Sequence, residues 1–267
     1  KKGGYNEAVI IKRLLREDWV KVPFSQLTIG HLTQYRDKRL ETLKTSTFRR
    51  EWVCVCSIAR YAKHVNITVN MTIFKEMKTP RVEERPIERV TPEMETRLLE
   101  AARLAGNRVR YLPHFIDLAL ATAMRRGEIC SLEWQHVDLK NQRIYVLSTK
   151  TKSGKGRTIP ITARAAKALD ALDSLRRIDR KTGELHKHVI PATGNAVRLA
   201  FSRIKKLVDL DHVRIHDLRH ESISRFWEFG LTIPEIMLIS GHSDLETLRR
   251  YSHASPTTLI EKLGEGI

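Results

Sequence analysis

The first third of the chain carries apolar side chains at helical spacing in three stretches. These lie in residues 7–19, in a segment that Thr28 can cap, and in a segment that begins near Ser46. The third stretch presents an apolar side formed by Phe48, Trp52, Val55, Cys56, Ala59 and Ala62. The pattern predicts a small, all-helical amino-terminal module.

A break in this pattern follows, where three prolines stand among alternating charges between residues 78 and 92. Such a stretch is poor material for a helix or a core, and it favours an exposed connection. We therefore predict a helical domain at residues 1–80, a linker at 81–90 and a second domain at 91–267.

The pattern changes its period inside the second domain. Residues 143–147 and 157–161 alternate as two short strands, and the basic, glycine-containing turn 150–156 joins them. Helix starts are predicted at or near Thr91, Phe115, Gly127, Thr162, Gly194, Thr232 and Ser243. The predicted fold is thus mainly α with a small antiparallel sheet, in the α+β class.

The charge of the chain points to a polyanionic partner. Lys and Arg number 48 against 31 Asp and Glu, which leaves a net charge of +17. A field of this sign attracts nucleic acid, so double-stranded DNA is the predicted partner. Residues 1–90 hold 19 basic against 10 acidic residues, so this part is expected to be the denser electrostatic clamp. No apolar run approaches the roughly 20 residues that a membrane span needs, and no membrane association is predicted.

The three cysteines, an odd number, give little sign of disulfides or of a metal site. Cys54 and Cys56 fall on an apolar helical pattern, and Cys130 stands apart from them. Reduced thiols are therefore predicted, in agreement with a cytoplasmic location at the nucleoid. The chain opens at Lys1 without an initiator Met, which favours a fragment of a longer protein.

Phosphoryl chemistry usually involves a nucleotide or a metal, and the sequence carries a convincing motif for neither. Ser153-Gly-Lys-Gly156 lacks the frame of a Walker loop, and the acidic residues do not cluster as two-metal ligands would. His216 and His220 have a spacing that can hold zinc on one helix face, but Arg219 in the same neighbourhood would oppose a cation. No metal and no cofactor are predicted.

The same segment suits an anion better, because His216 and Arg219 point the same way on a helix and can grip one phosphate. Four further pieces accompany it: Ala121-Thr-Ala-Met-Arg125-Arg-Gly-Glu128, a Lys in a strand-turn-strand, Gly241-His242, and Tyr251 nine residues later. Over about residues 90 to 255, the five pieces together resemble the catalytic domain of the tyrosine recombinase (phage integrase) family. Thr122-Ala123 departs from the Thr-Gly common in that family, a change we expect to be harmless because Ala also permits close helix packing.

The resemblance implies a catalytic role for each matched residue. Arg125 and Arg219 would clamp the non-bridging oxygens of the scissile phosphate, because a planar, permanently charged guanidinium matches two oxygens at once. Lys152 would be the general acid that protonates the departing 5′-hydroxyl. Lys150 and Lys155 lie on the same turn and are the alternatives for that role.

The remaining matched residues would handle protons and carry out the attack. His216 and His242 would add hydrogen bonds and transfer protons near neutral pH. Tyr251 would attack the phosphorus to form a 3′-phosphotyrosyl link, which a second strand's 5′-hydroxyl can displace without ATP or metal. Arg126 is predicted to be a DNA-backbone or surface contact, and Glu128 a buried hydrogen-bonding support.

Members of this family grip DNA between two domains that form a C-shaped clamp. The amino-terminal module is similar to the family's core-binding domain in size, helicity and charge. Its predicted DNA contacts are Lys44, Thr45, Arg49, Arg50, Arg60 and Lys63. Those of the catalytic domain are Arg126, Lys150 and Lys155. The alternative is that these residues form a solvated basic face.

The predicted function is site-specific recombination of DNA by a nucleoid, phage or mobile-element protein. The resemblance implies a dimer on each site and a tetramer in the synapse. A type IB topoisomerase and a non-catalytic DNA-binding protein on the same fold are the alternatives. The tail after Tyr251, with Leu259, Ile260 and Leu263, is open to packing on its own subunit or on a neighbour. The sequence does not identify the DNA site, the direction of recombination or a removed amino-terminal arm-binding domain.

Overall fold

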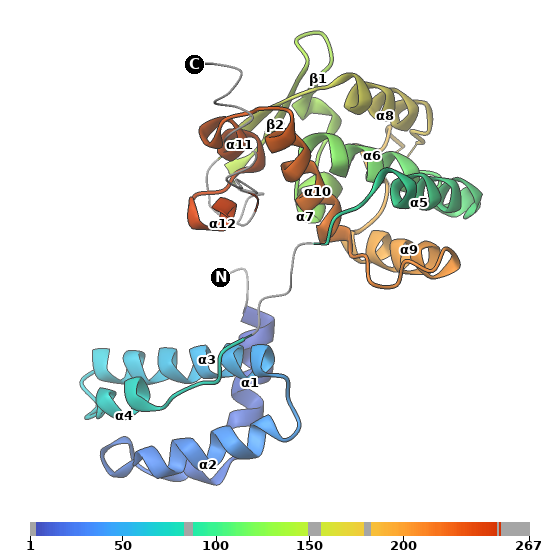
Figure 1. Cartoon of the computed structure of the whole chain (residues 1–267). Coiled ribbons are helices and arrows are strands. Elements are labelled where there is room, and N and C mark those ends of the chain that lie inside the picture. The colour runs from blue at the N-terminus through green and yellow to red at the C-terminus, as the bar shows by residue number, and fades with distance from the viewer. Residues whose placement is uncertain (1–3, 83–87, 149–155, 179–182, 250, 252–267) are drawn as a thin grey trace, which may run out of the picture. The chain divides into compact units, whose positions relative to one another are not determined.

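The chain divides into two compact units, Lys1–Arg85 and Pro86–Ile267, which we call unit 1 and unit 2 (Figure 1). The computed structural model describes residues 4–82, 88–148, 156–178, 183–249 and 251. Within these residues, no helix is both long enough and apolar enough to cross a membrane. The assignment of the two parts of the chain as a DNA clamp and a catalytic domain stays a prediction.

Unit 1 is helical in its described part. Its elements are α1 (Gly4–Leu14), the 3-10 helices η1 (Asp18–Lys21) and η2 (Phe24–Gln26), α2 (Ile29–Leu40), α3 (Thr45–His64) and α4 (Met71–Glu76). The helix α3 packs against α1, α2 and α4. As predicted, it buries Phe48, Trp52, Val55, Ala59 and Ala62, whereas Cys56 is half-buried.

The predicted first helix is wrong at its end. Residues 7–19 were expected to form one helix, but α1 ends at Leu14 and Leu15 is 64% exposed. Trp19 reaches the core of unit 1 from η1 instead. Apolar residues of two consecutive elements happened to share one spacing, so the periodicity ran on across the break. The short helix α4 was not predicted.

Unit 2 combines helices with a small sheet. Its helices are α5 (Pro92–Leu104), η3 (Asn107–Val109), α6 (Leu112–Thr122), α7 (Arg126–Cys130), η4 (Trp134–His136), α8 (Ala163–Ser174), α9 (Gly194–Leu207), α10 (Ile215–Glu228), α11 (Ile233–Ser240) and α12 (Glu246–Arg249). The helix α6 is buried along most of its length, and α5, α8, α9 and α10 pack against it. The core of unit 2 is therefore built around α6.

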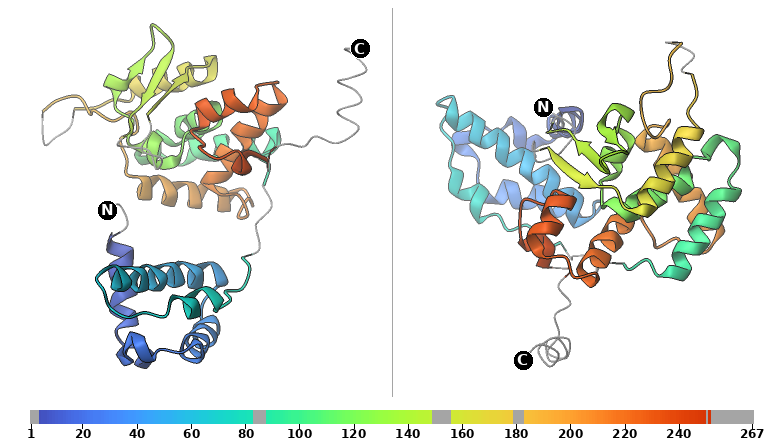
Figure 2. Two further views of the ribbon diagram at one scale, coloured as in Figure 1. Left: turned by 90° about the vertical axis from the view of Figure 1, so that its left-hand side faces the viewer. Right: turned by 90° about the horizontal axis from the view of Figure 1, so that it is seen from above.

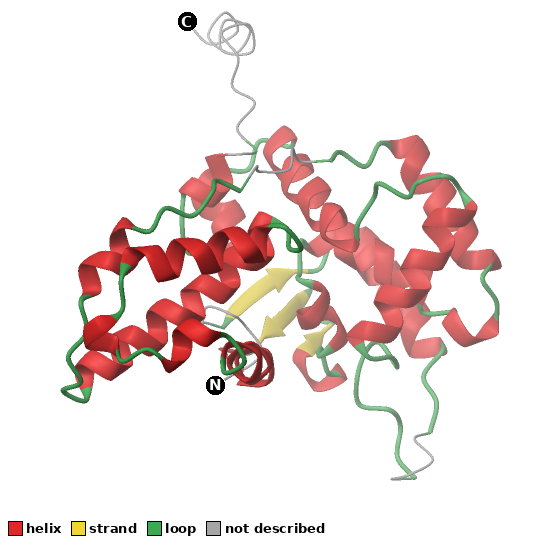
Figure 3. Ribbon diagram, turned by 90° about the horizontal axis from the view of Figure 1, so that it is seen from below, coloured by secondary structure: helices red, strands yellow, loops and turns green. Residues whose placement is uncertain are grey.

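The sheet contains three short antiparallel strands in the order β1 (Val137–Asp138), β2 (Arg143–Val146) and β3 (Arg157–Pro160). Figures 2 and 3 show these strands lying side by side among the helices of unit 2. Ile144 pairs with Ile159, and both side chains are buried. This confirms the two predicted strands and the mainly α fold with a small antiparallel sheet. The strand β1 is only two residues long and was not predicted.

Side-chain caps explain where several helices of unit 2 begin. The hydroxyls of Thr91 and Thr162 accept the backbone N–H three residues on, as is usual for an N-cap. The predicted box at Thr232 is confirmed, since its backbone N–H donates to the Glu235 carboxylate at 2.7 Å. The box predicted at Ser243 is wrong, because Asp244 accepts the backbone N–H of Glu246 at the start of α12. A carboxylate one residue later served the same purpose.

Candidate active site

Arg219 lies at the centre of the candidate site and is only 3% exposed. It projects from α10, and its guanidinium donates to the carbonyls of Ala123, at the end of α6, and Ser240, at the end of α11. Burial, together with the nearby positive charge of Arg125, lowers the pKa of Arg219 to about 9. The side chain therefore remains charged at pH 7, and an anion brought next to it would be stabilised.

The carbonyl of Ala123 reaches Arg219 because the backbone turns sharply there. Ala123 caps α6 in the left-handed conformation, with φ of 51°. We expected the change from Thr-Gly to be harmless because Ala packs closely, but that reason is incomplete. Glycine suits this position because it adopts a positive φ at little steric cost, and Ala adopts it here with some strain.

Arg125 is held beside this turn by Glu128. The backbone N–H of Arg125 donates to one carboxylate oxygen of Glu128 at 2.9 Å, and Nη1 donates to the other at 3.0 Å. Nη2 contacts the Gly241 carbonyl at 3.5 Å, and the side chain keeps 23% of its surface exposed. Arg125 and Arg219 thus meet at the turn that follows α11, and Arg125 remains open to a ligand.

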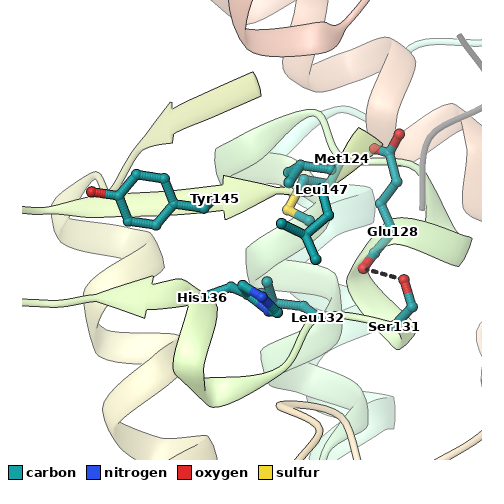
Figure 4. Close-up of a pocket in the computed structure, with 8 residues that line it drawn as sticks. Met124, Glu128, Ser131, Leu132, His136, Tyr145 and Leu147 are labelled. Atoms are coloured by element: carbon teal, nitrogen blue, oxygen red, sulfur yellow. Dashed lines mark hydrogen bonds between the residues drawn. The ribbon is translucent and has the colours of Figure 1, made fainter. Parts of the chain in front are cut away.

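Glu128 is the buried hydrogen-bonding support that the sequence predicted. Burial opposes its ionisation, but hydrogen bonds and charge from Arg157 and Arg125 outweigh burial and hold the pKa of Glu128 below its usual value. In Figure 4 its carboxylate extends away from Leu132 and His136, which line a pocket of about 10 Å³. That pocket has room for about one water molecule, so it is too small for an organic ligand.

Arg157 is an important residue that sequence reasoning missed. It begins β3, its side chain is 5% exposed, and it donates to both carboxylate oxygens of Glu128 at 2.7 and 3.2 Å. Its Nε donates to the carbonyl of Ile239 at 2.7 Å. Arg157 therefore ties the sheet, α7 and α11 together. The contacts span 29 and 82 residues of sequence, so no local pattern signals them.

His242 is a neutral imidazole in this setting. Burial, followed by the charges of Arg219 and Arg125, lowers the pKa of His242 to about 4. Since a guanidinium can only donate, Arg219 donates to Nε2 at 3.2 Å, which assigns the ring proton to Nδ1. Nδ1 faces the Ser240 hydroxyl at 2.8 Å. The single N–H of the neutral His242 thus points at the Ser240 hydroxyl, and the ring adds no charge to the site.

Tyr251 is buried, with 1% of its surface exposed, and its hydroxyl contacts Nδ1 of His220. The ring of His220 also meets that of His216 edge to face, with centroids 4.6 Å apart. His216 is exposed to solvent, whereas His220 is half-buried. The phenol is therefore inside the protein but joined to the basic cluster by imidazoles on α10.

Electrostatic influence shows that these groups share one site. Arg219, Arg125, His220 and His216 all act on the pKa of His242, and Tyr251 acts on that of Arg219. Five of the six predicted catalytic residues are therefore brought together. The sixth, Lys152, lies outside the described residues, as do Lys150 and Lys155.

The remaining predicted contacts are accessible. Arg126 is exposed at the start of α7. On unit 1, Lys44, Arg49, Arg50, Arg60 and Lys63 are exposed and Thr45 is half-buried. In the part of the chain that the structure describes, no group of three or more His, Cys, Asp or Glu residues could hold a metal ion.

His220 is a second residue of the cluster to which the sequence assigned no role. The sequence places it four residues after His216, on the same face of one helix, a spacing that by itself indicates only a candidate zinc site. The signal for a second imidazole on this face of α10 was therefore present. Its partner was not evident, because Tyr251 is 31 residues away.

The arrangement can bind a phosphate and attack it. Two guanidinium groups meet at one turn beside the neutral His242, and they can stabilise charge that builds on phosphate oxygens. A phenol lies beside imidazoles of the same cluster. A phenol is a weak nucleophile at neutral pH, so such surroundings are needed to activate it.

Sequence comparisons agree with this chemistry. The phage integrase family model matches residues 88–258. A shufflon-specific DNA recombinase of Escherichia coli is 31% identical over 247 residues, which cover 89% of this chain and 61% of the relative. A putative integrase/recombinase of Haemophilus influenzae is 25% identical, over 98% of this chain and 84% of the relative. The chain thus spans less than two thirds of the shufflon recombinase.

Solved structures share the fold. The Tn1549 transposon integrase, in complex with a circular intermediate DNA, matches with a TM-score of 0.81 at 17% identity, over 99% of this chain and 93% of that chain. A lambda integrase dimer bound to a COC′ core site matches with a TM-score of 0.72 at 18% identity, over 94% and 71%. A lambda integrase tetramer bound to a Holliday junction matches with a TM-score of 0.67 at 18% identity, over 91% and 72%.

Proposed function

The chain belongs to the phage integrase family, and on that basis we propose that it is a site-specific DNA recombinase that cleaves and rejoins strands through Tyr251. One observation carries the proposal. The Tyr251 hydroxyl lies against an imidazole of α10, the helix that also supplies Arg219, and Arg219 meets Arg125 at the turn after α11. A nucleophile and a phosphate-binding pair are thus parts of one site.

The two arginines hold the scissile phosphate. Arg125 is partly exposed and is oriented by Glu128, so its guanidinium can receive two phosphate oxygens. Arg219 directs three of its five N–H bonds at Ala123, Ser240 and His242, which fixes its plane before DNA arrives. A preorganised charge of this kind stabilises the transition state without reorganisation during the reaction.

The reaction then proceeds by two exchanges at phosphorus. The Tyr251 oxygen forms a bond to phosphorus while the bond to the 5′-oxygen breaks, and Lys152 protonates the departing 5′-oxygen. The 5′-hydroxyl of another strand later displaces the tyrosine. In the sequence Lys152 falls between β2 and β3, outside the described residues, and Arg157, the first residue of β3, bonds Glu128. Each exchange replaces one ester with another, so neither ATP nor a metal is required.

DNA binding is assigned to both parts of the chain. Unit 1 carries the exposed basic residues of α3, and Arg126, Lys150 and Lys155 belong to unit 2. We propose a dimer on each recombination site and a tetramer in the synapse, in keeping with the lambda integrase assemblies. The protein would act in the cytoplasm, on the DNA of a bacterial nucleoid, a phage or another mobile element.

A suicide duplex, nicked near the crossover so that the cleaved end is lost, tests the proposal. The wild-type protein should become covalently attached to the DNA in EDTA. Tyr251→Phe should bind the duplex and remain free, whereas Tyr145→Phe, a change on the exposed side of β2, should be trapped like the wild type. Equal trapping of Tyr251→Phe and wild type would refute the assignment.

Strand exchange separates recombination from the topoisomerase alternative. A recombinase joins strands of two differently labelled duplexes, whereas a type IB topoisomerase rejoins the strand that it cut. We expect recombinant product between two labelled duplexes that carry the site. Relaxation of supercoiled DNA without any exchange would favour the topoisomerase.

A further inference from the structure

We propose that His220 is the catalytic base that accepts the phenolic proton of Tyr251, an inference that rests on the proposed function. The motif that defines the site assigned no role to this residue. Its Nδ1 contacts the Tyr251 hydroxyl, and the centroids of the two rings lie 5.6 Å apart. A base must lie within hydrogen-bond reach of the proton that it removes, and His220 meets this condition.

The position of His220 links the nucleophile to the phosphate site. His220 follows Arg219 directly in α10, and its ring contacts that of His216. It is half-buried, which limits competition from water, whereas His216 is exposed towards the solvent from which DNA arrives. The two imidazoles thus have different roles: His216 hydrogen-bonds the phosphate, and His220 receives the proton of the Tyr251 hydroxyl.

The proton balance of the step is complete. The Tyr251 oxygen forms its bond to phosphorus as its proton passes to Nδ1 of His220, whose other ring nitrogen already carries a hydrogen. The bond from phosphorus to the 5′-oxygen breaks, and that oxygen takes a proton from the general acid. In the rejoining step the 5′-hydroxyl oxygen bonds to phosphorus and returns its proton to the deprotonated general acid, while the departing phenol oxygen recovers its proton from the His220 imidazolium. Nothing is oxidised or reduced, and no further reactant is needed.

The surrounding charges make this proton transfer depend on bound DNA. Arg219 and His216 on α10, Arg125 at the start of α7 and His242 after α11 belong to the same cluster. Arg125, Arg219 and Arg157 bring three positive charges to the cluster, beside the single carboxylate of Glu128. A phosphate, whose negative charge grows as the phenol attacks, offsets them. The negative charge of a bound phosphate therefore favours transfer of the Tyr251 proton to His220.

Single-turnover cleavage of the suicide duplex tests the role of His220. His220→Ala should lower the rate of covalent attachment by about 100-fold or more, the usual contribution of a catalytic base. Free imidazole should restore part of the rate, because it can enter the vacated space and accept the proton. A residue that merely held Tyr251 in place would give no such rescue. His212→Ala, a change to an exposed histidine before α10, should react like the wild type.

A second variant guards against misfolding of His220→Ala. His220→Asn keeps a hydrogen-bonding group near the position of Nδ1 but accepts no proton at neutral pH. We expect it to bind the duplex normally and to cleave slowly. Wild-type rates in His220→Asn, or faster cleavage in either variant, would overturn the proposal and make His220 a residue that only stores the tyrosine.

A duplex with sulfur at the 5′-bridging position identifies which of the two proton transfers a variant has lost. A thiolate leaves without protonation, so this substrate should rescue Lys152→Ala and leave His220→Asn slow. Rescue of His220→Asn would mean that His220 acts on the leaving group, contrary to the proposal. A wild-type protein that formed no covalent complex would contradict the proposed function itself. A wild-type protein that formed the complex, with His220→Asn equally fast, would contradict only the role of His220.

Discussion

At the scale of single residues, His242 shows how neighbouring groups decide what a side chain contributes. Its sequence position predicted hydrogen bonding and proton handling near neutral pH. Burial and the two adjacent guanidinium groups lower the pKa of His242 to about 4, so the ring is neutral at pH 7. Of the two predicted roles, the structure supports hydrogen bonding, and proton transfer at this ring would need the negative charge of a bound phosphate.

This shift predicts how stability depends on pH. The pKa of His242 falls from 6.5 to about 4 on folding, so the unfolded chain binds the proton more tightly. Stability is then full above about pH 6.5 and is lost as the pH falls towards 4. Between pH 7.5 and pH 5 the loss from this residue is at most about 2 kcal/mol, and partial exposure of the ring reduces it.

Thermal unfolding of the wild type and of His242→Gln at the two pH values measures this contribution. The variant keeps a hydrogen-bonding side chain that does not titrate, so it should lose less stability on acidification than the wild type does. An identical pH dependence in the two proteins would show that His242 titrates normally in the folded state.

At the scale of elements, the end of α11 is shaped by a glycine. Gly241 terminates the helix with φ of 69°, and its carbonyl contacts Arg125. A Cβ atom at this position would lie 2.8 Å from Nη1 of Arg157. The position therefore needs glycine twice, once for the backbone and once for the approach of Arg157.

Gly230, between α10 and α11, offers a matched control for Gly241. It also has a positive φ, of 91°, but a Cβ atom there would meet nothing within 4 Å. Gly230→Ala should therefore cost only the backbone strain, about 1 to 2 kcal/mol. Gly241→Ala should cost more in the same urea titration and should slow cleavage as well, because Arg157 must move. Equal losses of unfolding free energy in the two variants would show that the Arg157 side chain moves aside at no cost.

At the scale of the whole molecule, the net charge of +17 predicts binding that depends on salt. Each phosphate contact releases condensed counterions, so the logarithm of affinity falls linearly with the logarithm of salt concentration. Arg49→Ala and Arg50→Ala on α3 should each lower the slope by about 1 if these side chains contact phosphates. Fluorescence anisotropy with a labelled duplex at several KCl concentrations measures the slope.

Lys21 supplies the control for this measurement. It is exposed but paired with Asp18 at 2.7 Å, and it was not among the predicted contacts. Lys21→Ala should leave the slope unchanged. An unchanged slope in the Arg49 and Arg50 variants would mean that α3 is the solvated basic face that the sequence left open as an alternative.

The sequence by itself determined the mainly α fold, the β2–β3 hairpin and the candidates for phosphate binding and attack. Periodicity and caps are local properties, and Arg125, Arg219 and Tyr251 stood in a recognisable order along the chain. Prediction from the sequence failed where local signals merge, as between α1 and η1, where apolar residues of two elements share one spacing.

Only the tertiary structure revealed Arg157, the neutral state of His242 and the contact of His220 with Tyr251. Each arises from groups that are distant in sequence and buried together, as when Arg157 reaches Glu128 and Ile239. Burial strengthens charge interactions and makes an unpaired polar group costly, so protonation states and partners follow from which side chains meet. Residue types and spacing do not contain that information until the chain has folded.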